Sequence, residues 1–85
     1  MHVPDEEIWV TDAVALDSSH VVLGFTDGAC GVLDMSPYFD DGVFQRLRDP
    51  EVFRTAKAGV NTVEWDNGAI DIAPETAYEN AVPLK

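Results

Sequence analysis

The single cysteine, Cys30, is the first side chain in this sequence that could do covalent chemistry. A catalytic thiolate needs a lowered pKa, which a histidine, a lysine or a helix N-terminus normally provides. Asp-Gly at positions 27–28 is typical of a two-residue hairpin turn. Such a turn places Cys30 opposite Phe25, on the same face as Leu23 and Val32. We therefore expect Cys30 to be a small core residue and not a nucleophile.

Two histidines are the candidates for acid–base catalysis. His20 lies about five strand positions from Cys30, which is on the order of 16–17 Å at the rise of a strand. The same register turns His20 to the face opposite Asp34, so it predicts no His–Asp dyad. No sequence pattern assigns His2 to a strand or a helix, so a site that uses His2 is kept as an alternative.

A second hairpin signal, Asn-Gly at positions 67–68, places Glu64 opposite Asp71. Paired carboxylates can share a proton or hold a metal ion. This pair falls on the face opposite Trp65, where we expect solvent, and nothing nearby supplies more oxygen ligands. A three-residue turn would remove the pairing. The sequence also lacks a glycine-rich phosphate loop, CxxC, HExxH and GxSxG, so we expect no cofactor, no metal and no enzymatic activity.

Most of the basic residues lie close together. Four of the five are Arg46, Arg48, Arg54 and Lys57. They either pair with neighbouring carboxylates or contact an anionic ligand or an acidic partner surface. These four residues are our candidate partner-binding set.

The overall composition limits the class of protein. The 85 residues carry 16 acidic and 5 basic side chains, a net charge of −11. This balance argues against nucleic-acid binding by the chain alone, because phosphate contacts need Lys and Arg. It favours a basic protein partner, although a salt-rich host would also explain it. One cysteine cannot form an internal disulfide, so we expect a reducing cytoplasm. No apolar run reaches the roughly 20 residues that span a bilayer, so we expect no membrane contact.

Hydrophobic periodicity predicts an α+β fold, a small and mostly antiparallel sheet of hairpins with two or three short helices packed on it. The length allows one domain over residues 1–85, with a core at about 8–80 and frayed ends at 1–6 and 81–85. In the first strand, Ile8, Val10, Val14 and Leu16 share a face. The other expected elements are strands at 21–25, 30–35, 62–65 and 69–72, helical turns at 43–48 and 50–55, and a short helix that begins at Pro74.

Several spaced motifs extend over roughly residues 8–80. They are Phe25-x-Asp27-Gly28, Gly31-x-Leu33-Asp34, Ser36-Pro37, Phe44-x-x-Leu47, Asp49-Pro50-x-x-Phe53 and Trp65-x-Asn67-Gly68-x-x-Asp71-Ile72-x-Pro74-Glu75-x-x-Tyr78. Together they resemble a family of small bacterial proteins, the domain of unknown function 2442 family. One departure is Ala73, where a polar capping residue is expected before the helix.

The resemblance implies a small α+β protein without an established activity or catalytic residues. Some members of the family look fused to a helix-turn-helix segment, and others look encoded beside toxin-like partners. With the acidity, this favours a non-enzymatic protein-interaction module, and more specifically the neutralising or regulatory half of a bacterial two-gene pair. The alternatives are a small-ligand-binding or weakly catalytic domain, using Glu64 and Asp71 or the basic stretch, and a homo-oligomer that associates through an open sheet edge.

Overall fold

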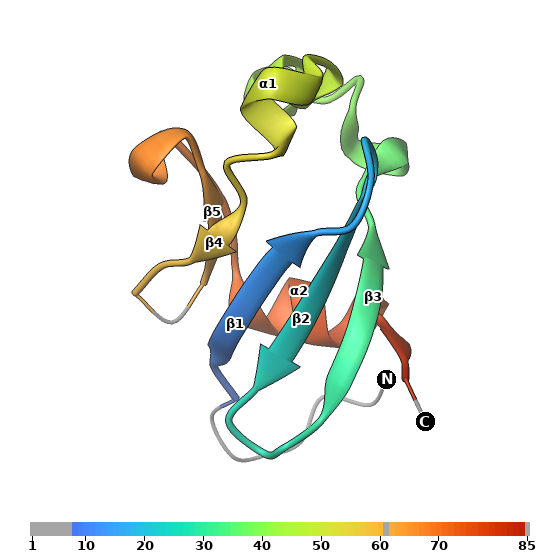
Figure 1. The fold of residues 1–85 in the computed structure, drawn as a ribbon, viewed down its shortest axis with the longest axis vertical. Coiled ribbons are helices and arrows are strands. Elements are labelled where there is room, and N and C mark those ends of the chain that lie inside the picture. The colour runs from blue at the N-terminus through green and yellow to red at the C-terminus, as the bar shows by residue number, and fades with distance from the viewer. Residues whose placement is uncertain (1–7, 61, 85) are drawn as a thin grey trace.

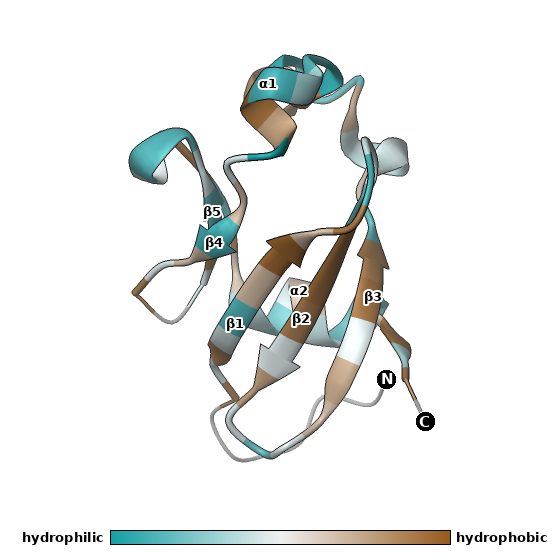
Figure 2. Ribbon diagram, viewed as in Figure 1, coloured by the Kyte–Doolittle hydropathy of each residue, from teal (hydrophilic) through white to brown (hydrophobic). Residues whose placement is uncertain are grey.

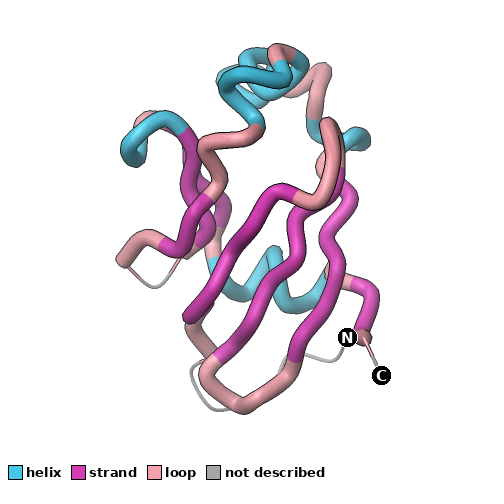
Figure 3. The backbone as a smooth tube through the Cα atoms, in the orientation of Figure 1, coloured by secondary structure: helices cyan, strands magenta, loops and turns pink. Residues whose placement is uncertain are grey.

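Two antiparallel sheets form the framework of the molecule in a computed structural model that describes residues 8–60 and 62–84. The larger sheet has the order β1-β2-β3-β7 and the smaller one β4-β5-β6 (Figure 1). The strands are β1 (Val10–Ala15), β2 (His20–Phe25), β3 (Cys30–Asp34), β4 (Lys57–Ala58), β5 (Val63–Trp65), β6 (Ile70–Ile72) and β7 (Val82–Pro83). Figure 3 shows the three long strands side by side, with one helix crossing behind them.

Short helices connect and cover the sheets, which confirms the small α+β class. They are η1 (Ser36–Tyr38), η2 (Gly42–Arg48), α1 (Pro50–Phe53), η3 (Asp66–Gly68) and α2 (Pro74–Asn80), where η denotes a 3₁₀ helix. Asp49 caps α1 as expected, because its carboxylate accepts a hydrogen bond from the Glu51 backbone N–H at 2.9 Å. α2 begins at Pro74 without a side-chain cap. Within the described residues, no helix has the length and apolar character needed to cross a membrane.

The core lies between the inner face of the larger sheet, the smaller sheet and α2. Figure 2 shows apolar segments along the long strands and polar ones on α1 and at the turn between β5 and β6. Phe25 packs edge-to-face on Tyr78 of α2 at a ring separation of 4.9 Å. The Tyr78 hydroxyl donates a hydrogen bond to Asp27 at 2.6 Å, which joins α2 to the β2–β3 loop. The largest fully buried side chains are Trp65, Phe53, Leu23, Leu33, Met35, Leu47, Ile70, Val21 and Val63.

The β2–β3 hairpin has a three-residue loop, so the register predicted from a two-residue turn is wrong by one position. The Phe25 N–H donates to the Ala29 carbonyl at 3.0 Å, and Gly28 adopts a left-handed φ of 87°. Gly24 therefore faces Cys30. Because a one-residue shift exchanges the two faces of a strand, Leu33 is buried and Cys30 is exposed. The prediction that Cys30 lies in the core is wrong.

β1 contains a bulge that the apolar alternation did not predict. Val10 pairs with Phe25, but Asp12 pairs with Gly24, so one extra residue is accommodated between them. From Asp12 onward, the bulge exchanges the two faces of the strand. The prediction that Val10, Val14 and Leu16 share one face is therefore wrong, because Val10 is buried while Val14 and Leu16 are exposed.

The second hairpin has the predicted register. Trp65 faces Ile70 and Glu64 faces Asp71. Its connection is longer than a two-residue turn, because η3 occupies the loop, with Asn67 in the left-handed region at a φ of 55°. Asn tolerates this conformation better than most residues.

The C-terminal segment, where a frayed end is expected, forms β7 in the part that is described. Ala81 is buried, and β7 pairs with β3 through Val82 opposite Val32. The Leu84 N–H donates to the Cys30 carbonyl at 2.9 Å. The other expected frayed end, residues 1–6, lies outside the described residues.

Candidate functional site

The two arginines of η2 bind carboxylates from other parts of the chain. Arg46 forms an ion pair with Asp66 in η3, twenty positions along the sequence. Arg48 forms an ion pair with Asp40 and donates a hydrogen bond to the Phe39 carbonyl at 3.2 Å. Both side chains are about half exposed, so these pairs hold η2 in place at the surface.

The other two candidate basic residues are also paired. Arg54, directly after α1, contacts Glu51 of that helix at 3.0 Å, and Lys57 on β4 lies 3.7 Å from Glu64 on β5. The four bases thus lie on η2, at the end of α1 and on β4, each with its own carboxylate, and do not converge on one ligand-binding point. Partner binding through them stays a prediction.

The facing carboxylates of Glu64 and Asp71 do not form a metal centre with other described residues. Glu64 turns toward Lys57 and lies over Gly59, where an added Cβ would meet its carboxylate. Asp71 is exposed. Across residues 8–60 and 62–84, no three His, Cys, Asp or Glu side chains gather closely enough to hold a metal ion.

A charged cluster at the β1–β2 turn is the arrangement that sequence reasoning missed. The Asp17 carboxylate accepts hydrogen bonds from the backbone N–H groups of Ser19 at 2.9 Å and His20 at 2.8 Å. The His20 Nδ1 lies 2.9 Å from Asp17 Oδ1, and its Nε2 lies 3.9 Å from Asp34 Oδ2. The expectation that the pleat separates His20 from Asp34 is wrong, because the true register pairs them. An Asp three positions before a His across a turn was the available signal.

The electrostatics of this cluster favour a charged pair. The hydrogen bond from the Ser19 N–H, with that to His20, lowers the pKa of Asp17 to about 2. The hydrogen bond to Asp17 raises the pKa of His20 above 6.5. Bonds from Ser36 lower the pKa of Asp34. The imidazolium and both carboxylates therefore coexist at mildly acidic pH.

The cluster has the residue types of a serine hydrolase but the wrong geometry. The Ser19 Oγ lies 3.0 Å from His20 Nδ1, the same nitrogen that faces Asp17. A catalytic triad needs serine and carboxylate on opposite nitrogens of the imidazole. Ser19 and Asp17 meet the same nitrogen, so the imidazole does not bridge them as it does in a triad. The arrangement is an ion pair that responds to pH.

Replacing Asp17 with Asn should lower the pKa of His20 toward its ordinary value of 6.5, because the imidazolium loses its carboxylate. The raised pKa of His20 stabilises the fold below its unfolded pKa, and this contribution disappears as pH rises through the folded pKa. The lowered pKa of Asp17 acts in the opposite sense. It stabilises the fold at pH values above 3.8, and this stabilisation is lost as the pH falls toward about 2. An NMR titration of the His20 ring checks this, with Asp71→Asn as the matched control. An unchanged titration in Asp17→Asn would contradict the assignment.

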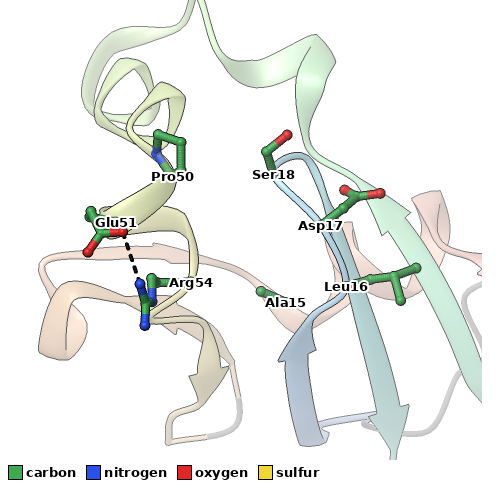
Figure 4. Close-up of a pocket in the computed structure, with 7 residues that line it drawn as sticks. All are labelled: Ala15, Leu16, Asp17, Ser18, Pro50, Glu51 and Arg54. Carbon is green, nitrogen blue, oxygen red and sulfur yellow. Dashed lines mark hydrogen bonds and ion pairs between the residues drawn. The ribbon is translucent and has the colours of Figure 1, made fainter.

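A shallow groove lies beside this cluster, between α1 and the β1–β2 turn (Figure 4). Its volume is about 300 Å³, at the lower end of the range for small-molecule sites. Arg54 and Glu51, which form an ion pair, lie on its α1 side, and Asp17 lies on the turn. The groove is lined by Ala15, Leu16, Asp17, Ser18, Pro50, Glu51 and Arg54.

The comparison with known families accounts for most of the chain. Residues 10–83 match the family described as Protein of unknown function (DUF2442). The chain belongs to the DUF2442 family. The match begins in β1 and ends in β7, so the family pattern spans both sheets and all the described helices. Neither the curated proteins nor the solved structures include a significant match.

Proposed function

We propose that this DUF2442 protein is a non-enzymatic protein-interaction module whose partner carries a basic surface. The observation that supports this is the net charge of −11, combined with ion pairs that engage all four described Lys and Arg side chains within the chain. The surface that remains is dominated by carboxylates. Such a field attracts a cationic protein and accelerates its association.

The more specific role is the neutralising or regulatory half of a bacterial gene pair that acts in the cytoplasm. Its support is the resemblance of the sequence motifs to a family in which some members look encoded beside toxin-like partners, together with a single cysteine that suits a reducing compartment. The neighbouring open reading frame offers a direct check. We expect it to encode a small basic protein that co-purifies with this chain when the two are expressed together.

Binding to the partner should weaken as salt increases, because counterions screen exposed charges over a Debye length of about 10 Å at 0.1 M. A pull-down with the full chain at low and moderate salt, followed by calorimetry on the recovered protein, measures this. We expect the dissociation constant to rise by up to about tenfold between low and moderate salt. Recovery of no protein at either salt concentration would contradict the proposed function.

A small-ligand function is the second candidate, and the groove between α1 and the β1–β2 turn is the observation that favours it. Two of its charged residues, Arg54 and Glu51, already bind each other at 3.0 Å. An anionic ligand would have to compete with that carboxylate. We therefore place this candidate below the protein-interaction module.

A further inference from the structure

The outer face of the larger sheet carries one valine from each of its four strands. Val14 pairs with Val22, Val22 with Val32, and Val32 with Val82. Directly paired residues in a sheet have neighbouring side chains about 5 Å apart. The four side chains therefore form one continuous row across the sheet, which we call the valine face.

None of the four valines belongs to the core of the described residues or is among the side chains packed against it. At its two ends Val14 is 64% exposed and Val82 is 68% exposed, while the two central valines are half-buried. α2 lies behind the three long strands (Figure 1). Because Val21, Leu23 and Leu33 are buried in the core, the alternating valines lie on the other side of the sheet. Leu16 and Leu84, both exposed, extend the apolar surface along the outer strands.

Carboxylates border the valine face on both sides along the strand direction. On one side Asp12 lies over Gly24, where an added Cβ would come within 3.2 Å of its Oδ2. On the other side Asp34 faces His20, which binds Asp17. The four strands contain no Lys or Arg. The surface is thus an apolar row between two acidic borders.

We propose that the basic partner docks on the valine face, through a segment with an apolar stripe flanked on both sides by Lys or Arg. This inference rests on the proposed function and adds the location and chemistry of the contact. The stripe covers the four valines, and the flanking cations meet Asp12 on one side and Asp34 on the other. Cationic groups beside apolar contacts match this pattern of charge, and they fix the orientation of the segment.

A second copy of the chain fits this surface poorly. The row spans about 14 Å across four strands at roughly 4.8 Å per gap. Stacked copies would bring their acidic borders together, with a net charge of −11 on each. A basic partner avoids this repulsion, and its cations add contacts beyond the valines.

The probe is a synthetic helical peptide with leucines on one face and lysines on both sides of them. A second peptide keeps every lysine and replaces the leucines with serines. We expect the leucine peptide to bind more tightly and to shift the NMR amide signals of Val14, Val22, Val32 and Val82. Binding of the two peptides with equal affinity would overturn the proposal, because charge alone would then explain it.

The double substitution Val14→Ser with Val82→Ser tests the surface itself. We expect it to weaken binding of the leucine peptide by about tenfold, because two exposed apolar side chains are lost from the contact. The matched control is Val43→Ser with Val60→Ser, since these valines are 48% and 87% exposed and lie outside the larger sheet. Circular dichroism and thermal unfolding verify that both variants fold.

The outcomes separate this inference from the proposed function. One outcome is that the Val14→Ser, Val82→Ser variant binds the leucine peptide and the recovered partner as tightly as the native chain does. In that case docking on the valine face is wrong, while the proposed function as an interaction module stands. If the native chain recovers no partner, the proposed function fails. Light scattering that shows a dimer lost only in this variant would assign the face to a second copy and overturn the proposal.

Discussion

Replacing Leu33 with Asp is expected to unfold the protein, whereas the same substitution at the neighbouring Val32 is expected to leave it folded. Leu33 is 1% exposed in the core, where an unpaired carboxylate costs several kcal/mol. A domain of this size rarely has more than about 3–5 kcal/mol of net stability. Val32 belongs to the valine face, so an Asp there stays hydrated. We expect it to lower the free energy of unfolding by about 1 kcal/mol, because Asp has a low strand propensity.

Circular dichroism and urea unfolding of the two variants measure this difference. Because the residues are adjacent and both become Asp, the two variants add the same charge to the same strand. A two-residue turn in the β2–β3 hairpin would exchange their faces. Unfolding of Val32→Asp with a folded Leu33→Asp would therefore contradict the register of β3.

Replacing Trp65 with Ala is expected to destabilise the domain by about 3–5 kcal/mol, enough to leave most of it unfolded. Trp65 is fully buried on β5, and its ring lies 5.9 Å from that of Phe53 on α1. Truncation leaves a large cavity where the smaller sheet meets the helices. Equilibrium urea unfolding measures the loss.

The matched control for this experiment is Trp9→Ala. Trp9 is 41% exposed, so we expect its removal to change the free energy of unfolding by no more than about 1 kcal/mol. Trp65→Phe gives a third point, because the Trp65 Nε1–H has no hydrogen-bond partner among the described residues. Phe removes that unsatisfied donor and keeps an aromatic ring, so we expect it to cost less than Ala. Equal losses at Trp9 and Trp65 would contradict the placement of the core.

Where neighbouring residues determine the conformation, the sequence predicted the structure. Asp49 before Pro50 predicted the capped start of α1, and Pro74 predicted the start of α2. The Asn-Gly signal at 67–68 predicted the pairing of Trp65 with Ile70. In each case the deciding interactions lie within a few positions of one another.

The sites depended on contacts between distant parts of the chain. The sequence showed the cluster of basic residues but not their partners, because Arg46 meets Asp66 only after η2 and η3 come together. It also separated His20 from Asp34, which the sheet pairs. Both contacts form only when whole helices and strands pack against one another.

Composition and local signals by themselves determined an acidic chain with an α+β fold built from hairpins and short helices. Only the tertiary structure decided which face of the first sheet is buried. Asp-Gly at 27–28 allows a two- or a three-residue loop, and the choice rests on Leu33 entering the core and on the bond from Tyr78 to Asp27. That one-residue difference, with the bulge in β1, turned Cys30 outward and aligned the valines on the exposed side.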